Sequence, residues 1–221
     1  MAPRTEPSAG AGPGAGATAA GSSAGPAGTT RERIAAAALS ILSEEGASAV
    51  TMRRVAAAAG VTPMATYRHY PSREALLNAV VDNVSEELGR DWEKRGEGGD
   101  FEHRAAELLD AFLDFALGSP AVYTLVMTDR RAGARRFPAD FRGGGSPTFT
   151  PMVRVVEQGM AEGELRSDDP LEATLAITAQ AQGLVQLYLG GRIGCSEEEF
   201  RALCKRSVGR VLNGFRVRGG T

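Results

Sequence analysis

Cysteine and histidine are both scarce in this sequence, which contains two of each among 221 residues. Cys195, Cys204, His69 and His103 do not stand at the spacings of metal ligands, so we expect no metal site. Two isolated cysteines favour reduced thiols in a cytoplasmic protein over a disulfide. No nucleophile and base occur at a recognisable catalytic spacing either. We therefore expect no catalytic residues, no cofactor and no enzymatic activity.

Long apolar runs are missing as well. No segment approaches the ~20 apolar residues of a membrane-spanning helix, and the N-terminus lacks the apolar core of a signal peptide. Hydrophobic residues make up 43% and charged residues 24% of the chain, as is usual for globular proteins. These features predict a cytoplasmic protein with no membrane partner. The length suffices for one or two domains with a substantial core.

The alternating pattern of β-strands does not appear, whereas apolar residues recur at helical spacing through most of the sequence. Thr29 and Glu32 have the spacing of a capping box, and Ser196 and Glu199 repeat it near the C-terminus. Gly46 marks the end of the first expected helix. We expect an all-α fold of about nine helices.

Residues 1–28 consist almost entirely of Ala, Gly, Pro, Ser and Thr. Such a segment cannot bury enough apolar surface to offset the entropy lost on ordering, so we expect a disordered low-complexity tail. A flexible arm in which Arg4 touches a DNA backbone is the alternative, but it would rest on a single basic residue.

The segment from Thr51 to Arg73 concentrates basic charge, with four arginines and no acidic residue in a chain whose formal charge is -2. Thr51 can cap a short helix that Gly60 ends, because glycine readily adopts the left-handed conformation. Thr62 can cap the next helix, with Pro63 at its first position. A helix, a short turn and a second helix form the layout of a helix-turn-helix, whose second helix enters the major groove of DNA.

The segment from Thr29 to Val84 resembles the DNA-binding domain of the TetR family of repressors. The resemblance rests on the stretches IAAAALSILSEEG and VTMRRVAAAAGVTPMATYRHYPSREALL and on the hydrophobic helix that follows them. Arg73 departs from the family, which usually has lysine there, but the positive charge is kept. The resemblance implies a DNA-binding domain over residues 29–84, with the motif at 51–70, and an effector-binding and dimerisation domain over residues 85–221.

Donor groups gather in and around the second helix of the motif. Hydroxyl, guanidinium and imidazole groups contact phosphate oxygens in protein–DNA complexes, and the resemblance gives Arg53 a contact to a base. Arg68 can face either a base or a phosphate, and the sequence leaves that choice open. The predicted DNA-binding residues are Thr51, Arg53, Arg54, Thr62, Pro63, Met64, Ala65, Thr66, Tyr67, Arg68, His69, Tyr70 and Arg73.

The helix expected over residues 171–191 carries one charge, Glu172, and is too apolar to face solvent on most sides. It could form the core of a monomer. We favour a homodimer, because in TetR relatives the last two helices pair with those of a second chain, and because a dimer doubles the contacts to DNA. The predicted interface residues are Leu175, Ala179, Gly183, Gln186, Phe200, Leu203, Cys204, Val208, Val211, Leu212 and Phe215.

Large and adaptable side chains lie along the middle helices, where they suit a pocket for irregular apolar ligands. Ordinary core packing is the alternative for each of them singly, and the family resemblance favours the pocket as a whole. Gln182 stands where a subgroup of the family has histidine, so no role of an imidazole transfers. The predicted ligand-binding residues are Phe112, Phe115, Tyr123, Met127, Phe149, Met152, Met160 and Tyr188.

Residues 130–146 are rich in arginine and glycine and contain Pro138. We expect a long, mobile loop here. Its arginines could form a second basic patch, but three consecutive glycines do not favour a rigid binding surface.

These features predict a ligand-responsive DNA-binding regulator. We expect a repressor that binds a (pseudo)palindromic operator as a dimer and is released by a small apolar or amphipathic effector. Its partners would be double-stranded operator DNA, the effector and a second copy of the chain. An all-α enzyme with a helix-turn-helix corner and an architectural DNA binder are the alternatives. The lack of catalytic groups disfavours the first, and the large helical remainder disfavours the second.

Overall fold

The computed structural model describes residues 28–217, and these fold into nine α-helices joined by three short helical segments. The predicted all-α fold is confirmed, and the one β-type pairing in the described range is the isolated bridge between Leu165 and Arg216. The tail expected over residues 1–28 lies outside the described residues, apart from Gly28. The elements are α1 (Thr30–Glu45), η1 (Ala47–Ala49), α2 (Met52–Ala58), α3 (Pro63–His69), α4 (Arg73–Arg95), α5 (Phe101–Gly118), α6 (Pro120–Tyr123), η2 (Thr124–Thr128), η3 (Ala139–Gly144), α7 (Thr150–Ala161), α8 (Pro170–Leu189) and α9 (Glu197–Phe215).

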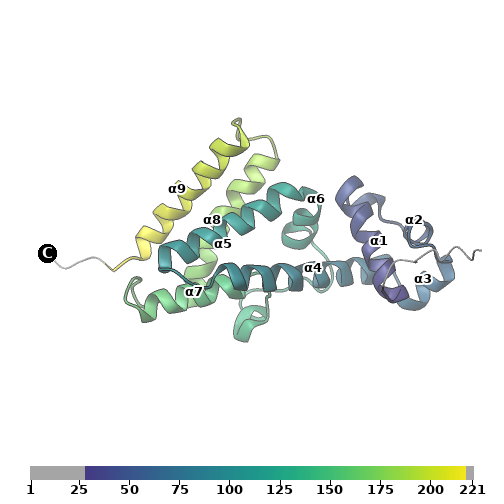
Figure 1. Cartoon of the computed structure of the whole chain (residues 1–221), viewed down its shortest axis with the longest axis horizontal. Helices are drawn as coiled ribbons and strands as arrows, with labels where there is room; N and C mark the ends of the chain where they lie inside the picture. The colour runs from purple at the N-terminus through teal and green to yellow at the C-terminus, as the bar shows by residue number, and fades with distance from the viewer. Residues whose placement is uncertain (1–27, 218–221) are drawn as a thin grey trace, which may run out of the picture.

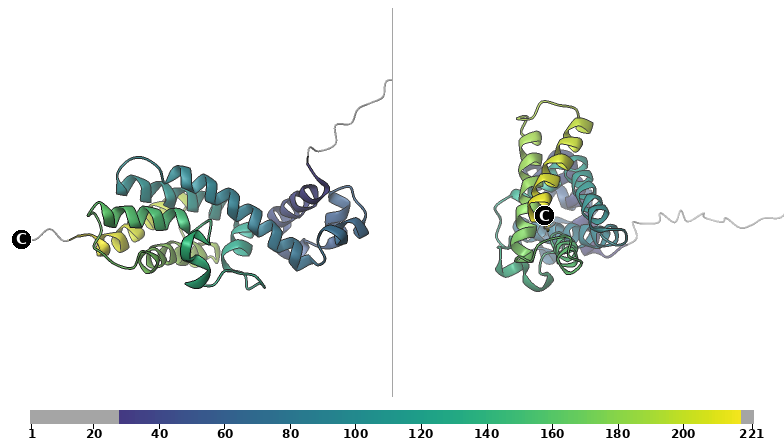
Figure 2. Two further views of the ribbon diagram at one scale, coloured as in Figure 1. Left: turned by 90° about the horizontal axis from the view of Figure 1, so that it is seen from below. Right: turned by 90° about the vertical axis from the view of Figure 1, so that its left-hand side faces the viewer.

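The helices form two bodies that α4 connects. In Figure 1, α1, α2 and α3 make a small domain at one end, and α5, α7, α8 and α9 make a larger body at the other. The left view of Figure 2 shows the same division from a second direction. α4 belongs to both parts, because Leu76 and Val80 are buried in the core of the small domain and Trp92 in that of the larger body.

The junction between the two bodies is packed. Val122 of α6 and Leu125 of η2 are buried in the same hydrophobic cluster as Ile34 and Leu42 of α1. The larger body therefore contacts the small domain through α6 and η2 as well as through α4.

Helix boundaries follow the capping signals of the sequence. The side chain of Thr29 accepts a hydrogen bond from the N–H of Glu32, whose carboxylate accepts one from the N–H of Thr29, so the predicted capping box is confirmed. Ser196 and Glu199 form the second predicted box. Gly46 follows the last residue of α1 with a φ of 84°, which glycine tolerates without strain.

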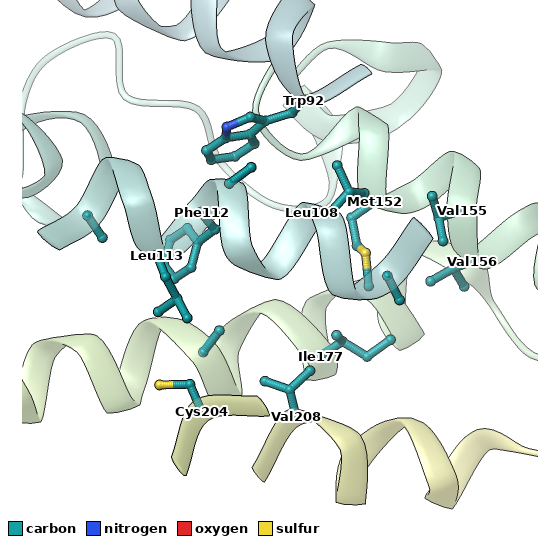
Figure 3. Packing of buried hydrophobic residues seen from close by; sticks show 14 of the residues in the cluster. Trp92, Leu108, Phe112, Leu113, Met152, Val155, Val156, Ile177, Cys204 and Val208 are labelled. Carbon is teal, nitrogen blue, oxygen red and sulfur yellow. The ribbon is translucent and has the colours of Figure 1, made fainter. Parts of the chain in front are cut away.

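The core of the larger body is built around α5, which packs against α4, α7, α8 and α9 (Figure 3). The rings of Phe112 and Phe115 each lie edge-on to Trp92 with centroids 6.3 Å apart, and both also meet the ring of Tyr123. Edge-to-face pairs add roughly 0.5–1.5 kcal/mol beyond the burial of area. This aromatic cluster fixes the place where α4 crosses α5.

The segment between η2 and α7 was expected to be a mobile loop, but it is docked on α4. Nη1 of Arg131 donates to Oδ1 of Asn78 at 2.9 Å, and Nδ2 of Asn78 donates to the carbonyl of Ala132 at 3.0 Å. Gly89 permits a close approach, since a Cβ there would lie 2.8 Å from the carbonyl oxygen of Pro147. The expectation was wrong because Arg131 finds its partner 53 residues away in the sequence.

No single helix within residues 28–217 is long and apolar enough to cross a membrane, although the bent pair Phe101–Gly118 and Pro120–Thr128 passes on length and composition together.

Candidate nucleic-acid interface and ligand cavity

α2 and α3 form the predicted helix-turn-helix. Thr51 and Thr62 cap these helices through their side-chain oxygens. In the turn between them, the N–H of Val61 donates to the carbonyl of Ala56 at 2.9 Å, and Gly60 adopts the left-handed conformation with a φ of 65°. A helix of seven residues is too short to be stable alone, so this turn and the packing behind it hold α3 in place.

The outward face of α3 consists of Thr62, Pro63, Met64, Tyr67 and Arg68, which are all exposed. Met64 is 73% exposed and Tyr67 49%, high values for large side chains with apolar surface. Tyr67 and Arg68 lie three and four positions after Met64, so each shares a face of the helix with it. An apolar side chain on such a face can contact the methyl group of thymine, while hydroxyl and guanidinium groups can donate to phosphates or bases.

Two predicted DNA-binding residues, Thr66 of α3 and Tyr70 directly after it, point into the domain instead. Thr66 is fully buried, and Tyr70 is 3% exposed with its hydroxyl donating to the carbonyl of Arg31 at 3.2 Å. We correct these two assignments, because the inward side of a short helix must pack on its neighbours to hold the helix in place. Ala65 and His69 are half-buried at the edge of the outward face.

The guanidinium group of Arg73 is also used within the domain. Its Nε donates to the carbonyl of Val50 at 2.7 Å and its Nη2 to the carbonyl of Ala47, which ties the start of α4 to the segment before α2. Arginine suits this task because its donors form a fixed fork. We therefore assign Arg73 a bracing role in place of the predicted phosphate contact.

Arg53 and Arg54 lie near the start of α2, and both are exposed. Arg54 forms an ion pair with Glu45 at the end of α1, and the hydrogen bond from Arg54 lowers the pKa of the Glu45 carboxyl. A phosphate approaching Arg54 would compete with that carboxylate. Arg53 is therefore the better placed of the two for a contact to DNA.

A cavity of about 250 Å³ lies inside the larger body. Its apolar lining includes Trp92 of α4, Leu108 and Phe112 of α5, Met152 of α7 and Ile177 of α8. Figure 3 shows these side chains among those that gather between the four helices. The volume lies just below the range of about 300–1,000 Å³ that is usual for small-molecule sites, so the cavity fits a compact apolar group.

One side of the cavity is polar. Nε of Arg135 donates to the carbonyl of Gly145 at 2.9 Å, and its Nη2 lies 3.7 Å from a carboxylate oxygen of Asp82. Burial lowers the pKa of Arg131, Asp82 opposes this effect, and the positive charge of Arg135 adds to it. The polar residues that line the cavity are Ser85, Asp129, Arg131, Arg135, Ser146, Thr148, Thr178 and Gln182.

The cavity contains half of the predicted ligand-binding residues, namely Phe112, Met127, Phe149 and Met152. The other four lie elsewhere in the core. Phe115 and Tyr123 belong to the aromatic cluster, Met160 packs at the edge of the core, and Tyr188 stacks on Phe200 with ring centroids 4.1 Å apart. The polar lining is not among the residues predicted from the sequence, although residues 129–146 contain five arginines against two aspartates.

Models of known families match both bodies of the structure. Residues 34–80 match a model described as bacterial regulatory proteins, tetR family, and residues 105–211 match one described as tetracyclin repressor-like, C-terminal domain. The chain belongs to the tetR family. It is a DNA-binding transcriptional regulator of a family that is not enzymatic.

Individual relatives of this TetR-family protein are distant. The nucleoid occlusion factor SlmA of Marinobacter nauticus is 26% identical over 164 residues, which are 74% of this chain and 81% of the relative. The structure of a protein with unknown function from Rhodococcus sp. RHA1 is 25% identical with a TM-score of 0.71 and covers 86% of this chain and 97% of its own. The transcriptional regulator FadR from Bacillus subtilis, solved in complex with stearoyl-CoA, is 14% identical with a TM-score of 0.67, covering 84% and 99%, and shows a likeness of fold alone.

α8 of this TetR-family protein packs against α9 and leaves one face outside. Leu175, Ala179, Gly183 and Gln186 are exposed on this face, and Leu187 beside them is 47% exposed. A Cβ added at Gly183 would meet nothing within 4 Å. We call these five residues the α8 strip.

α9 contributes less to the outer surface than predicted. Phe200, Cys204 and Val208 are buried in the core of the same chain, so we correct their assignment to a dimer interface. Burial also raises the pKa of the Cys204 thiol to about 11. The remaining predicted residues of α9, which are half-buried, are Leu203, Val211, Leu212 and Phe215.

Residues 28–217 contain no group of three or more His, Cys, Asp and Glu side chains that could hold a metal ion. His103 is exposed.

Proposed function

We propose that this TetR-family regulator is a repressor that binds a (pseudo)palindromic operator as a homodimer and is released by a small amphipathic effector. The main support for the proposal is that α4 takes part in both the cavity and the small domain. Ser85 and Trp92 of this helix line the cavity, while Leu76 and Val80 of the same helix hold the core of the small domain. A ligand in the cavity would therefore touch the helix that positions α3.

Release would follow from a difference in ligand affinity between two positions of α4. A ligand that binds more tightly to one position shifts the population toward it. Two copies of α3 must match half-sites one helical turn apart, about 34–36 Å, so a small tilt of α4 in each protomer lowers the fit to the operator. Allosteric couplings of this kind typically amount to about 1–3 kcal/mol, or roughly 5–150-fold in affinity.

The α8 strip supports the dimer. Ala179 and Gly183 are small and exposed, which lets a second helix approach closely, and Leu175 and Leu187 flank them with apolar surface. Covering this strip with a second copy would remove that surface from water. We expect an interface on the order of 1,600 Å² or more in total area.

Within this proposal, residues 29–84 are the DNA-binding unit and residues 85–221 the effector-binding and dimerisation unit. The protein would act in the cytoplasm, where operator DNA is located.

Selection of bound sequences from a random pool of duplex DNA tests the proposal. We expect an enriched site with two-fold symmetry, whose half-sites are about one helical turn apart, and binding that weakens steeply with salt. A promoter that overlaps this site should be silenced by the protein in a reporter assay. Enrichment of no sequence, or of an asymmetric single half-site, would contradict the proposed operator.

A DNA-binding role without a ligand is the competing function, and it is favoured by the relative that is named a nucleoid occlusion factor. The cavity and its contact with α4 favour the ligand-responsive role. A screen of small amphipathic compounds against the protein–operator complex separates the two. Release of DNA by at least one compound at concentrations that fill the cavity supports the effector, whereas binding in the cavity with no change in operator affinity supports the competing role.

A further inference from the structure

We infer that the effector is an amphipathic organic anion, whose apolar part occupies the cavity and whose anionic head binds Arg131 and Arg135. This inference rests on the proposed ligand-responsive function and adds the chemical class of the ligand.

Arg131 has an unused donor inside the protein. Its Nη1 donates to Oδ1 of Asn78 at 2.9 Å, but among the described residues its Nε has no hydrogen-bond acceptor although the atom is buried. A buried donor without a partner is costly, because it has lost its hydrogen bonds to water. Arg131 lines the cavity, so a small shift of its side chain would bring this donor to an acceptor oxygen on a ligand there.

Arg135 lies at the same polar side. Its Nη2 is 3.7 Å from Asp82, which is longer than the roughly 2.7–2.9 Å of a strong charge-assisted hydrogen bond. Asp129 is the one carboxylate in the lining of the cavity itself. The ion pair between Arg135 and Asp82 is the one that Arg135 forms among the described residues, and it is long.

A second hollow adjoins the cavity. It is lined by residues 130–136 and by Asp140, and it shares Arg131, Ala134 and Arg135 with the cavity. Four arginines and one aspartate thus surround it, and a carboxylate oxygen of Asp140 already accepts from the backbone N–H of Arg136 at 2.7 Å. Positive charge is therefore in excess next to the apolar interior.

An amphipathic anion satisfies both parts of this site. Hydrocarbon fits the lining formed by Trp92, Leu108 and Phe112, and oxygens of the head can accept from the planar fork of a guanidinium group. A neutral oxygen can accept from Nε of Arg131 but brings no negative charge to the two guanidinium groups, and a cation would face two like charges. Because the cavity holds only about 250 Å³, the apolar part fills it and the head stays at the arginines.

The same arginine connects the head site to the DNA-binding domain. Asn78, which binds Arg131, lies within the residues 34–80 that match the family's DNA-binding model. An anion that draws Arg131 away from Asn78 would loosen the loop from α4. Binding of the head would thereby change the restraint on the helix that positions α3.

A matched series of eight-carbon ligands tests the inference on the full chain without DNA. The probes are octanoate, octyl phosphate, 1-octanol and octylammonium. Trp92 is the one tryptophan of the sequence and lines the cavity, so its fluorescence reports binding. We expect at least one of the two anions to bind about tenfold or more tightly than 1-octanol, and octylammonium to bind most weakly. The ratio between the two anions distinguishes a carboxylate head from a phosphate head.

Substitutions at Arg131 and Arg135 test whether these residues bind the anionic head of the ligand. Arg131→Gln should weaken the preferred anion about tenfold or more and leave 1-octanol unchanged, whereas Arg131→Lys should retain most of the preference because the charge is kept. Arg135→Gln should act in the same direction. Arg142→Gln is the matched control, since Arg142 is exposed on the same loop and lines neither hollow. The inference is overturned if 1-octanol binds as tightly as both anions, or if Arg131→Gln and Arg135→Gln each keep the parent's affinity for them.

Failure of the ligand class and failure of the regulatory function give different results. A protein that binds a selected operator but prefers 1-octanol keeps the proposed function and overturns the inference. A protein that prefers the anions but selects no DNA sequence overturns the proposed function and leaves the ligand class of the cavity supported.

Discussion

Asn78 of α4 exchanges two hydrogen bonds with the docked loop: its Oδ1 accepts from Nη1 of Arg131 at 2.9 Å and its Nδ2 donates to the carbonyl of Ala132 at 3.0 Å. The Asn78 side chain therefore ties the loop that borders the cavity to the helix that carries the small domain. For the proposed ligand, this contact would form part of a physical route to α3, because it joins the loop beside the cavity to α4.

Asn78→Ala should reduce the coupling between ligand and operator. Without the two hydrogen bonds, a ligand at the loop no longer changes the restraint on α4, so we expect the ligand's effect on operator affinity to fall by about fivefold or more. Ligand affinity itself should change less, since Asn78 does not line the cavity. Titrations of operator with and without ligand measure the coupling. Asn83→Ala, an exposed position on the same helix, is the control, and equal coupling in both variants would refute the route.

Arg53→Ala should relax the base preference at one position of the operator. Arg53 is exposed at the start of α2, and a bidentate contact to a base contributes about 1–3 kcal/mol of discrimination. Binding to variants of the selected operator, one base pair changed at a time, would show the loss. An unchanged preference at every position would refute the assignment, and the same assay on Arg68→Ala decides whether that residue faces a base or a phosphate.

Tyr67→Phe and His69→Ala should weaken binding to all sequences about equally. Tyr67 lies on the outward face of α3 and His69 at its edge, where a hydroxyl or imidazole group can reach a phosphate oxygen. The dependence of binding on salt should change little for Tyr67→Phe, because the lost hydroxyl is neutral. A loss confined to one base pair would contradict the phosphate role.

Sequence reasoning worked best where the signal is local. The caps at Thr29, Thr51, Thr62 and Ser196 were predictable because a side-chain oxygen and the backbone N–H groups it satisfies lie within three residues of each other. The helix-turn-helix followed from these caps and from the glycine at position 60. The matching of residues 34–80 to the family model agrees with that prediction.

Which side of a short helix faces the core was harder to predict. The chemistry of Thr66 and Tyr70 predicts donors for DNA, but Thr66 is buried and the hydroxyl of Tyr70 binds the carbonyl of Arg31 in α1. Arg73 was misjudged for a related reason, since the carbonyls of Ala47 and Val50 that it binds are more than twenty residues away. Periodicity over seven residues is too brief to fix which side is buried.

The cavity was predictable only in part because it depends on contacts between distant segments. Phe112 and Met152 lie on helices with clear apolar stripes, and both line it. Arg131 reaches it only because Asn78 and Gly89 allow the loop to dock on α4. No local pattern in an arginine-glycine segment indicates such a docking site.

Lowering the pH should reduce the stability of the fold, because it protonates the carboxylate of Glu162. Arg104, which is 5% exposed, donates Nη2 to this carboxylate at 2.9 Å, and hydrogen bonds from Arg104 and then Gln158 lower the pKa of Glu162. A carboxyl with a lowered folded-state pKa stabilises the fold above its unfolded pKa of about 4.3 and loses this contribution as the pH falls through the folded value. Glu162→Gln should therefore lower the Tm at pH 7.

The difference in Tm between Glu162→Gln and the parent should shrink as the pH falls below about 4, because the parent's carboxyl is then protonated as well. Melting curves followed by circular dichroism at pH 7 and at lower pH measure this. Glu157→Gln is the control, at an exposed position of α7, the helix that Glu162 directly follows. A difference for Glu162→Gln that does not depend on pH would contradict the ion pair as its cause.

The α8 strip yields the last prediction. Gly183 is exposed, with nothing within 4 Å of the position a Cβ would take, so Gly183→Glu fits the isolated chain without a clash. Glutamate also forms helix more readily than glycine, so the variant should keep its helical content. In a dimer that covers the strip, however, the new carboxylate would be buried without a partner, at a cost of several kcal/mol.

We expect light scattering to give a dimeric mass for the parent at micromolar concentration and a monomeric mass for the variant, with loss of tight binding to a two-fold operator. Ala106→Glu, at an exposed position of α5, is the control and should remain dimeric. A monomeric parent would exclude the dimer, and a Gly183→Glu variant that stays dimeric and binds the operator normally would place the interface elsewhere.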